Sequence, residues 1–188
     1  MVGRHRGSRR LVWTAPLLAL LLLAETAAGQ TGQFGAFTLH GAAVRGLQPD
    51  DATVRGGLRA DLTFVIKRFS LGPEAGVYFT GPKSVSPNPD RGENVITVGG
   101  VTRFRFADGS WRPFLVGGLG VYGWESNRPG YATGTEVSGS LGVGLLRVLT
   151  PRGTGLSGEF RLHQQLARSP LTTSRRFVTL TAGITLGW

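Results

Sequence analysis

The sequence contains no cysteine, so a disulfide framework, a thiolate metal site and a cysteine nucleophile are all excluded. After Gly29 it also lacks a sustained helical apolar period and any run approaching the roughly 18 apolar residues that a membrane helix needs. Acidic residues are few, at 11 against 21 lysines and arginines. The chain must therefore gain its stability from the architecture of strands, without covalent cross-links.

Residues 1–29 have the pattern of a secretory signal peptide. Four arginines occur within the first ten residues, an apolar run follows over residues 11–24, and small residues close the segment. The apolar run is short for a spanning helix, and an uncleaved anchor is the alternative interpretation. We therefore predict a signal peptide over residues 1–29 and a single domain over residues 30–188.

The basic excess persists after the predicted cleavage. Removing residues 1–29 takes away four arginines and one glutamate, which leaves 17 basic against 10 acidic residues. The remaining arginines are scattered along the chain instead of gathered in a patch, and an exported chain rarely meets nucleic acid. We expect no nucleic-acid partner, and an anionic surface such as lipopolysaccharide suits outward-facing arginines better.

The exported part of the chain alternates between apolar and polar residues with the two-residue period of β-strands. An even number of segments near ten residues or longer is typical of a membrane-spanning barrel, in which ~9–11 tilted residues cross the bilayer. The predicted strands run over residues 34–45, 52–67, 69–80, 95–106, 111–124, 136–149, 155–165 and 177–188.

The connections between these strands alternate in length. Tight turns are predicted around Arg68, over residues 107–110 and over residues 150–155. The connections between them are longer and polar, among them the stretch "GPKSVSPNPDRGEN". Short turns on one rim and longer loops on the other are typical of an outer-membrane barrel, with the turns in the periplasm and the loops outside the cell.

The Asp108-Gly109 pair predicts a two-residue type I′ turn, because both positions of that turn need a positive φ. Such a turn places Phe106 opposite Trp111 and sets the register of the hairpin. In this register one face pairs mostly apolar residues, and the other face pairs Arg105 with Arg112. The two faces of the hairpin therefore differ in character.

The same separation of faces recurs in other strands. In the last predicted strand Val178, Leu180 and Ile184 share one face, and threonines and glycines occupy most of the other. Because a charged face cannot look at lipid, we predict that the charged faces line the interior and form ion pairs that plug the lumen. The predicted network comprises Arg55, Arg59, Asp61, Glu74, Arg103, Arg105, Glu159 and Arg161.

Two carboxylates of this network are predicted to face each other. A tight turn at Lys67-Arg68 places Asp61 directly opposite Glu74 on the next strand. Like charges in this arrangement repel each other unless a cation lies beside them. We predict that Arg59 and Arg103 supply that charge.

Aromatic residues are predicted to form a belt at each end of the strands, as at the two interfaces of a membrane. Beside the short turns or the terminus lie Phe64, Phe69, Phe106, Trp111 and Trp188. Beside the long loops lie Tyr78, Phe79, Tyr122, Trp124 and Phe177.

With these features the chain resembles the small eight-stranded outer-membrane barrels of the OmpX/OmpA/OmpW type. The resemblance implies an all-β, eight-stranded antiparallel up-and-down transmembrane β-barrel in a bacterial outer membrane, without a cofactor. It also implies that Ile184, Leu186 and Trp188 form the signal read by the barrel-assembly machinery, although members of the family usually end in phenylalanine. The implied role is non-enzymatic, with extracellular loops that contact an unspecified partner and with surrounding outer-membrane lipids as neighbours.

Other motifs in the sequence give weaker signals. The string "GTGLSG" matches a dinucleotide-binding pattern, but a strand follows it where that site needs a helix. Asp50, Asp51, Asp90 and Glu93 lack the spacing of a calcium loop and are interpreted as solvated charges.

Two alternative functions stay open. "EFRLHQQ" resembles the outer-membrane lipid A deacylases, in which a histidine and a serine two residues later act on a lipid ester. Here Gln165 takes the serine position, and the strand pattern places His163 on the interior face. The other alternative is a soluble ligand-binding barrel of lipocalin type, which would bury its apolar face.

Overall fold

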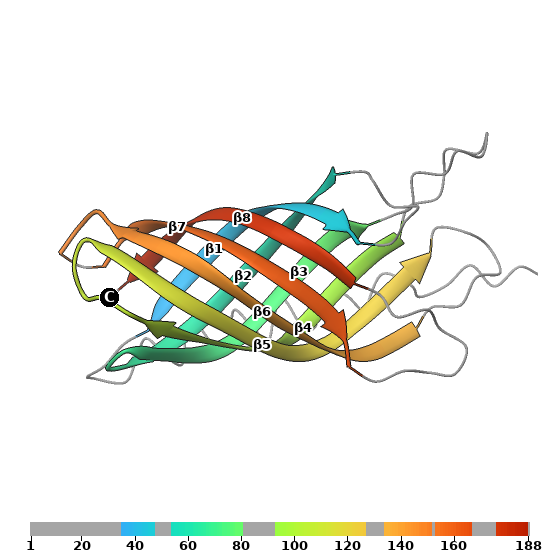
Figure 1. The fold of residues 1–188 in the computed structure, drawn as a ribbon, viewed down its shortest axis with the longest axis horizontal. Helices are drawn as coiled ribbons and strands as arrows, with labels where there is room; N and C mark the ends of the chain where they lie inside the picture. Colours follow the sequence, from blue (N-terminus) through green and yellow to red (C-terminus); the bar gives the residue numbers. More distant parts are fainter. Residues whose placement is uncertain are drawn as a thin grey trace, which may run out of the picture. The chain divides into compact units, whose positions relative to one another are not determined.

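A computed structural model describes residues 35–47, 54–80, 93–126, 134–151, 153–166 and 176–187. These residues form eight strands: β1 (Ala36–Gly46), β2 (Val54–Ile66), β3 (Phe69–Thr80), β4 (Glu93–Arg105), β5 (Trp111–Ser126), β6 (Gly134–Val148), β7 (Gly155–Gln165) and β8 (Arg176–Gly187). Each strand pairs antiparallel with the next, and β1 pairs with β8 to close a barrel (Figure 1). The predicted all-β, eight-stranded up-and-down barrel is confirmed, whereas the predicted signal peptide lies outside the described residues.

Alternate residues of each strand face opposite sides of the barrel wall. In β7, Glu159 and Arg161 are buried, whereas Leu156 and Phe160 between and beside them are exposed. Every strand contributes exposed large apolar side chains to the outer face, including Leu39, Leu58, Leu71, Val98, Leu119, Leu141, Phe160 and Leu180. The apolar faces therefore look outward and the charged faces look inward.

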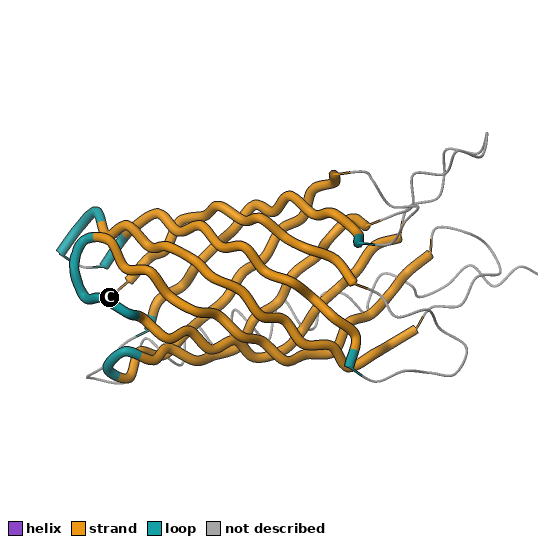
Figure 2. Tube along the Cα trace, viewed as in Figure 1, coloured by secondary structure: helices purple, strands orange, loops and turns teal. Residues whose placement is uncertain are grey.

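Short connections join the strands at one end of the barrel (Figure 2). Lys67 adopts a φ of 55° in the turn between β2 and β3, the left-handed conformation that such a tight turn demands. Asp61 pairs with Glu74 across these two strands, as predicted from the turn. Within the described part of the chain, no helix is long and apolar enough to cross a membrane.

The predicted register of the β4–β5 hairpin is wrong by two residues. Neither Asp108 nor Gly109 has a positive φ, and the backbone N–H of Phe106 donates to the carbonyl of Pro113, at 3.0 Å. Arg105 consequently pairs with Phe114 and not with Arg112, which avoids two like charges directly opposite each other. A shift of two residues keeps every side chain on its predicted face.

The predicted aromatic belt beside the short turns is supported by four exposed side chains, those of Phe64, Phe69, Phe106 and Trp111. The predicted belt beside the long loops is wrong in part, because Tyr78, Tyr122 and Phe177 are buried inside the barrel. Adjacent residues of a strand face opposite sides, so Tyr78 and the exposed Phe79 cannot both face outward. The Trp124 side chain and Trp188 lie outside the described part.

Candidate functional site

Six charged side chains meet in the middle of the barrel interior and form what we call the central cluster. They come from strands β2, β3, β4 and β7, and all six are buried: Arg59, Asp61, Glu74, Arg103, Glu159 and Arg161. Three guanidinium groups therefore face three carboxylates. Buried charges are costly unless they are paired, and here the numbers of each sign are equal.

Arg103 connects two of the carboxylates. Its Nη1 and Nη2 atoms donate to the two oxygens of Asp61, each at 2.8 Å, in the two-pronged geometry typical of strong arginine–carboxylate pairs. Its Nε atom donates to Oε1 of Glu159 at 2.9 Å. Because Arg103 lies on β4 and Glu159 on β7, this contact crosses the lumen.

Glu159 is the carboxylate that all three arginines contact. Besides Arg103, Arg59 donates through Nη2 at 2.5 Å and Arg161 donates through Nε at 2.8 Å, both to Oε2. Arg161 also donates through Nη1 to both oxygens of Glu74, at 3.0 and 2.8 Å. Arg59 completes the arrangement with Nε 3.4 Å from Oε2 of Glu74. The like-charged pair Asp61 and Glu74 thus has arginines on both members.

His40 is a member of this region that sequence reasoning did not assign. It is fully buried on β1, with Nε2 3.8 Å from Oδ2 of Asp61 and 3.8 Å from Oε1 of Glu159. Neither of its ring nitrogens has a hydrogen-bond partner within the described residues. Its position among inward-facing residues of β1 was the only available signal in the sequence.

The other two residues of the predicted network lie outside the central cluster. Arg105 lies near the short turns, where it donates to the backbone carbonyl of Lys67 and its Nη1 is 3.9 Å from Oδ1 of Asp108. Arg55 has inward strand parity and is partly buried, and it forms no ion pair with another described residue. The structure therefore brings six of the eight predicted residues together.

A layer of aromatic residues and histidine fills the interior on the loop side of the central cluster. The Tyr122 hydroxyl lies 2.7 Å from Nδ1 of His163, and Nε2 of His163 lies 3.1 Å from the Thr179 hydroxyl. The His163 ring stacks on Phe177, with centroids 4.4 Å apart and planes inclined by 4°. His163 is thus held on the interior side, as predicted, and Gln165 is buried on the same face.

Apolar side chains fill the interior on the side of the short turns. Phe114 packs there with Val101 and Val116, and the Arg103 guanidinium lies over the Phe114 ring at 5.8 Å. Two glycines of β6 leave room for this layer and for the central cluster beside it. A Cβ at Gly144 would overlap the Phe114 ring, and a Cβ at Gly142 would lie 2.9 Å from Cγ of Arg161.

A small cavity lies beside these layers in the described part of the barrel. A cavity of about 10 Å³ lies among Glu74, Thr97, Tyr122 and Ser140. This volume is close to what one water molecule requires.

The remaining sequence motifs do not form a binding site in the described residues. Gly155 begins strand β7, so the glycine string is not followed by the helix N-terminus that a pyrophosphate site needs. Ile184 and Leu186 are exposed on the outer face, whereas Trp188 lies outside the described residues. Of the acidic residues weighed as calcium ligands, Asp50, Asp51 and Asp90 lie outside the described residues, and Glu93 begins β4 with its side chain outside the description. No group of three His, Asp or Glu in the described segments is arranged to hold a metal.

Comparison with known proteins finds similarity in solved structures. Neisserial surface protein A is 12% identical to this chain with a TM-score of 0.65, and the match covers 82% of this chain and 97% of that one. The N-terminal β-barrel domain of Pseudomonas aeruginosa OprF is 11% identical with a TM-score of 0.47, covering 82% and 100%. The outer membrane enzyme PagL is 13% identical with a TM-score of 0.46, covering 81% and 99%.

No model of a protein family and no curated protein sequence matches the chain. At these identities the structural similarity concerns the fold. The chain has the fold of the small eight-stranded outer-membrane β-barrels, and the resemblance inferred from the sequence is confirmed at that level.

Proposed function

We propose that the protein is a non-enzymatic barrel that spans the bacterial outer membrane and acts through structure or through contacts of its extracellular loops. The observation that carries this proposal is the opposite character of the two barrel faces. Large apolar side chains are exposed on every strand, while six mutually paired charges are buried within. A protein in water would bury these large apolar side chains, whereas a barrel in lipid exposes them to the hydrocarbon.

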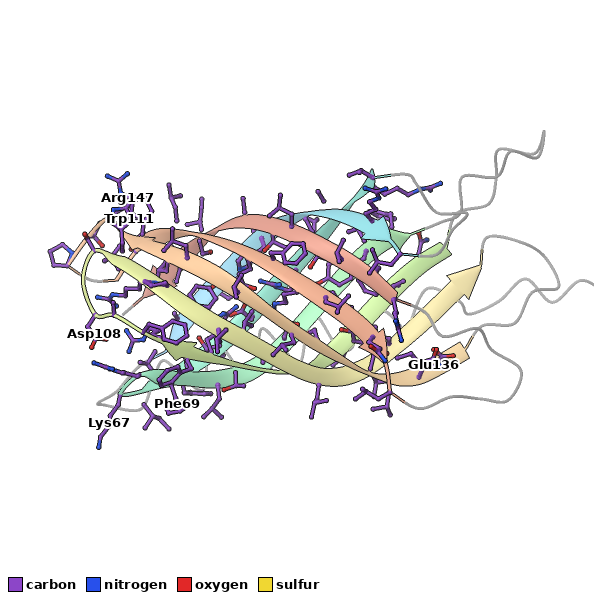
Figure 3. The ribbon with its side chains drawn as sticks, viewed as in Figure 1. Lys67, Phe69, Asp108, Trp111, Glu136 and Arg147 are labelled. Atoms are coloured by element: carbon purple, nitrogen blue, oxygen red, sulfur yellow. The ribbon has the colours of Figure 1, made fainter. Side chains whose placement is uncertain are left out.

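The turn-side rim supports this placement. Trp111 and Arg147 are direct partners across β5 and β6, and the Arg147 guanidinium lies 5.0 Å from the Trp111 ring centroid. Figure 3 shows these two side chains together near the short turns, with Glu136 toward the other end of the barrel. Aromatic and basic side chains of this kind are favoured where hydrocarbon meets lipid headgroups.

The interior supports a closed lumen. Eight strands enclose a space that side chains can fill, unlike the water-filled channels of barrels with ~16 strands. Here the central cluster spans that space, with aromatic residues on one side and apolar residues on the other. We therefore expect the protein not to conduct ions.

Export and assembly follow from the proposed location. A cleaved signal peptide over residues 1–29 would deliver the chain to the periplasm. The barrel-assembly machinery would then recognise the last strand through Ile184, Leu186 and Trp188. Lipopolysaccharide and other outer-membrane lipids would surround the finished barrel.

The two alternative functions have less support. A lipid hydrolase needs its histidine near the lipid, but His163 and His40 are both buried in the interior. A lipocalin-type barrel would keep apolar side chains inside, but Leu58, Leu119 and Leu180 are among the most exposed on the outer face. The non-enzymatic membrane barrel accounts for both observations.

Fractionation of a Gram-negative host that expresses the full chain tests the location. We expect the protein in the outer membrane, with a gel mobility that shifts on heating. A peptide tag inserted after Ser86 should bind antibody on whole cells, whereas a tag after Gly109 should bind only after the outer membrane is broken. A soluble periplasmic product would contradict the proposal, and reversed tag accessibility would invert the topology.

Planar-bilayer recording tests the closed lumen. Purified wild-type protein should insert without stepwise currents. Lipid analysis of cells with and without the protein tests the absence of enzymatic activity, and loss of acyl chains from lipid A would favour the hydrolase.

A further inference from the structure

The outer wall contains a groove that the proposed function does not use. It has a volume of about 630 Å³ and crosses strands β4 to β7. Its described lining is uncharged, and two of its residues, Leu141 and Leu119, are 69% and 66% exposed. The groove therefore opens on the face that is proposed to contact lipid.

A glycine creates part of the hollow. At Gly117, an added Cβ would find no atom nearer than 3.8 Å, so the space in front of its backbone is open. Gly139 lies beneath leucine side chains, with Leu166 Cδ1 3.2 Å from the position of an added Cβ. The groove thus has a backbone floor at Gly117 and leucine walls.

The strand register connects this groove to two arginines on the loop side. One row of paired residues runs from Arg176 through Gln164 and Gly139 to Leu119. The neighbouring row runs from Arg45 through Val178, Leu162 and Leu141 to Gly117 and Thr102. Both rows therefore begin at an arginine and end at the groove.

The two rows lead from the rim toward the middle of the wall. Arg176 is the first residue of β8, whereas Leu119 lies well inside β5. Three strand spacings separate them, or about 14 Å. This separation runs across tilted strands, so only part of it is depth in the membrane.

Both arginines are available to a ligand. Arg45 and Arg176 lie on the adjacent strands β1 and β8, and both are exposed. Each alternates with a buried residue, Val44 and Phe177 respectively, so both face outward. Neither forms an ion pair with another described residue. Arg176 lies one strand and Arg45 two strands beyond the described lining of the groove, and two outward cations beside an apolar groove are complementary to an anionic lipid.

We propose that the groove and these arginines bind one lipopolysaccharide molecule through its lipid A part. An acyl chain lies in the groove over Gly117, and a phosphate group of the headgroup contacts Arg45 and Arg176. The loop side is the outer-leaflet side of the proposed topology, which is where this phosphorylated glycolipid resides. The inference therefore rests on the proposed outer-membrane location.

Native mass spectrometry of the full-length, detergent-folded protein tests the site, with purified bisphosphorylated lipid A as the probe. Wild type should retain one lipid A. The double variant Arg45→Gln/Arg176→Gln should weaken retention tenfold or more, but should leave binding of fully dephosphorylated lipid A unchanged. Gly117→Leu should weaken retention of both forms, because its side chain fills the groove.

Matched controls use equivalent positions elsewhere on the outer wall. Gly41 on β1 also faces outward with open space, and Arg147 faces outward at the turn side. Gly41→Leu and Arg147→Gln should retain lipid A like wild type. If Gly117→Leu does not fold, the exposed arginine pair still tests the headgroup contact.

Several outcomes would overturn the proposal. These are unchanged retention in the arginine variant, equal loss in Gly41→Leu, and equal binding of phosphatidylglycerol. Each variant is first checked for heat-shifted mobility and insertion into vesicles. Failure of wild type to insert would refute the outer-membrane proposal itself, whereas inserted protein without lipid A selectivity would refute the groove assignment alone.

Discussion

Arg161 and Glu74 join opposite walls of the barrel. Nη1 of Arg161 on β7 lies 3.0 and 2.8 Å from the two carboxylate oxygens of Glu74 on β3, four strands away in the closed order. The wall is held by backbone hydrogen bonds between neighbouring strands, but this contact ties strands that do not touch. The central cluster therefore acts as a brace across the lumen.

Glu159→Gln should strongly destabilise the barrel. The substitution keeps the size of the side chain but removes the negative charge that Arg59, Arg103 and Arg161 share. Leaving buried charge without its partner costs about 3–5 kcal/mol. Denaturant unfolding in lipid vesicles measures the loss.

The control for this substitution is Asp108→Asn. Asp108 is 60% exposed and lies 3.7 Å from Arg68 Nε and 3.9 Å from Arg105 Nη1. Exposed pairs contribute about 0–1 kcal/mol, so its effect should be small. Equal losses in the two variants would show that the cluster contributes nothing beyond a surface ion pair.

A double-mutant cycle of Arg161→Met and Glu74→Gln should give a coupling free energy of about 1–3 kcal/mol, because the two groups are in direct contact. The same cycle between Arg161→Met and Asp108→Asn should be additive within about 0.5 kcal/mol. Urea or guanidinium unfolding of the four proteins in each cycle provides the values. Additive effects in the first cycle would contradict a stabilising role of the contact between Arg161 and Glu74.

Gly142→Ala should destabilise the barrel by about 1–3 kcal/mol, the usual effect of overpacking. The added Cβ would overlap the Phe160 carbonyl oxygen and lie 2.9 Å from Arg161 Cγ. Gly117→Ala on the neighbouring strand meets nothing nearer than 3.8 Å and should be nearly neutral. Thermal unfolding in one detergent compares the two, and equal stability would contradict the close packing of Arg161 against β6.

The two glycine-containing turns should respond differently to alanine. Gly153 has a φ of 84°, so Gly153→Ala should cost about 1 kcal/mol. Gly109 has no positive φ and nothing within 4 Å of an added Cβ, so Gly109→Ala should be neutral or slightly stabilising. A loss of stability at Gly109 would instead support the type I′ turn predicted from the sequence.

The barrel architecture was predictable because strand alternation is a local property. Each charged residue of the cluster alternates with apolar residues in its own strand, so the face of Glu159 follows from Leu156 and Phe160 alone. The contact between Asp61 and Glu74 followed from one tight turn. The identity of the inward-facing charges was therefore accessible without knowing which strands meet across the lumen.

Other features depend on interactions that the sequence pattern does not contain. The β4–β5 register places Arg105 opposite Phe114 and not Arg112, and the Asp108-Gly109 pair does not encode this. Tyr78 and Tyr122 resemble interface aromatics in the sequence, but they pack around His163 inside. The position of His40 beside Asp61 and Glu159 depends on how β1 is aligned with β2 and with β8. The sequence pattern does not contain these two alignments.

The charges of the central cluster are also balanced along the chain. Strands β2 to β4 supply Arg59 and Arg103 against Asp61 and Glu74, and β7 supplies Glu159 with Arg161. Each segment therefore brings equal positive and negative charge to the cluster before the other arrives. A sheet that has gained β2 to β4 together therefore carries no net charge from this cluster, nor does β7, and β7 completes the brace only when the sheet curls shut.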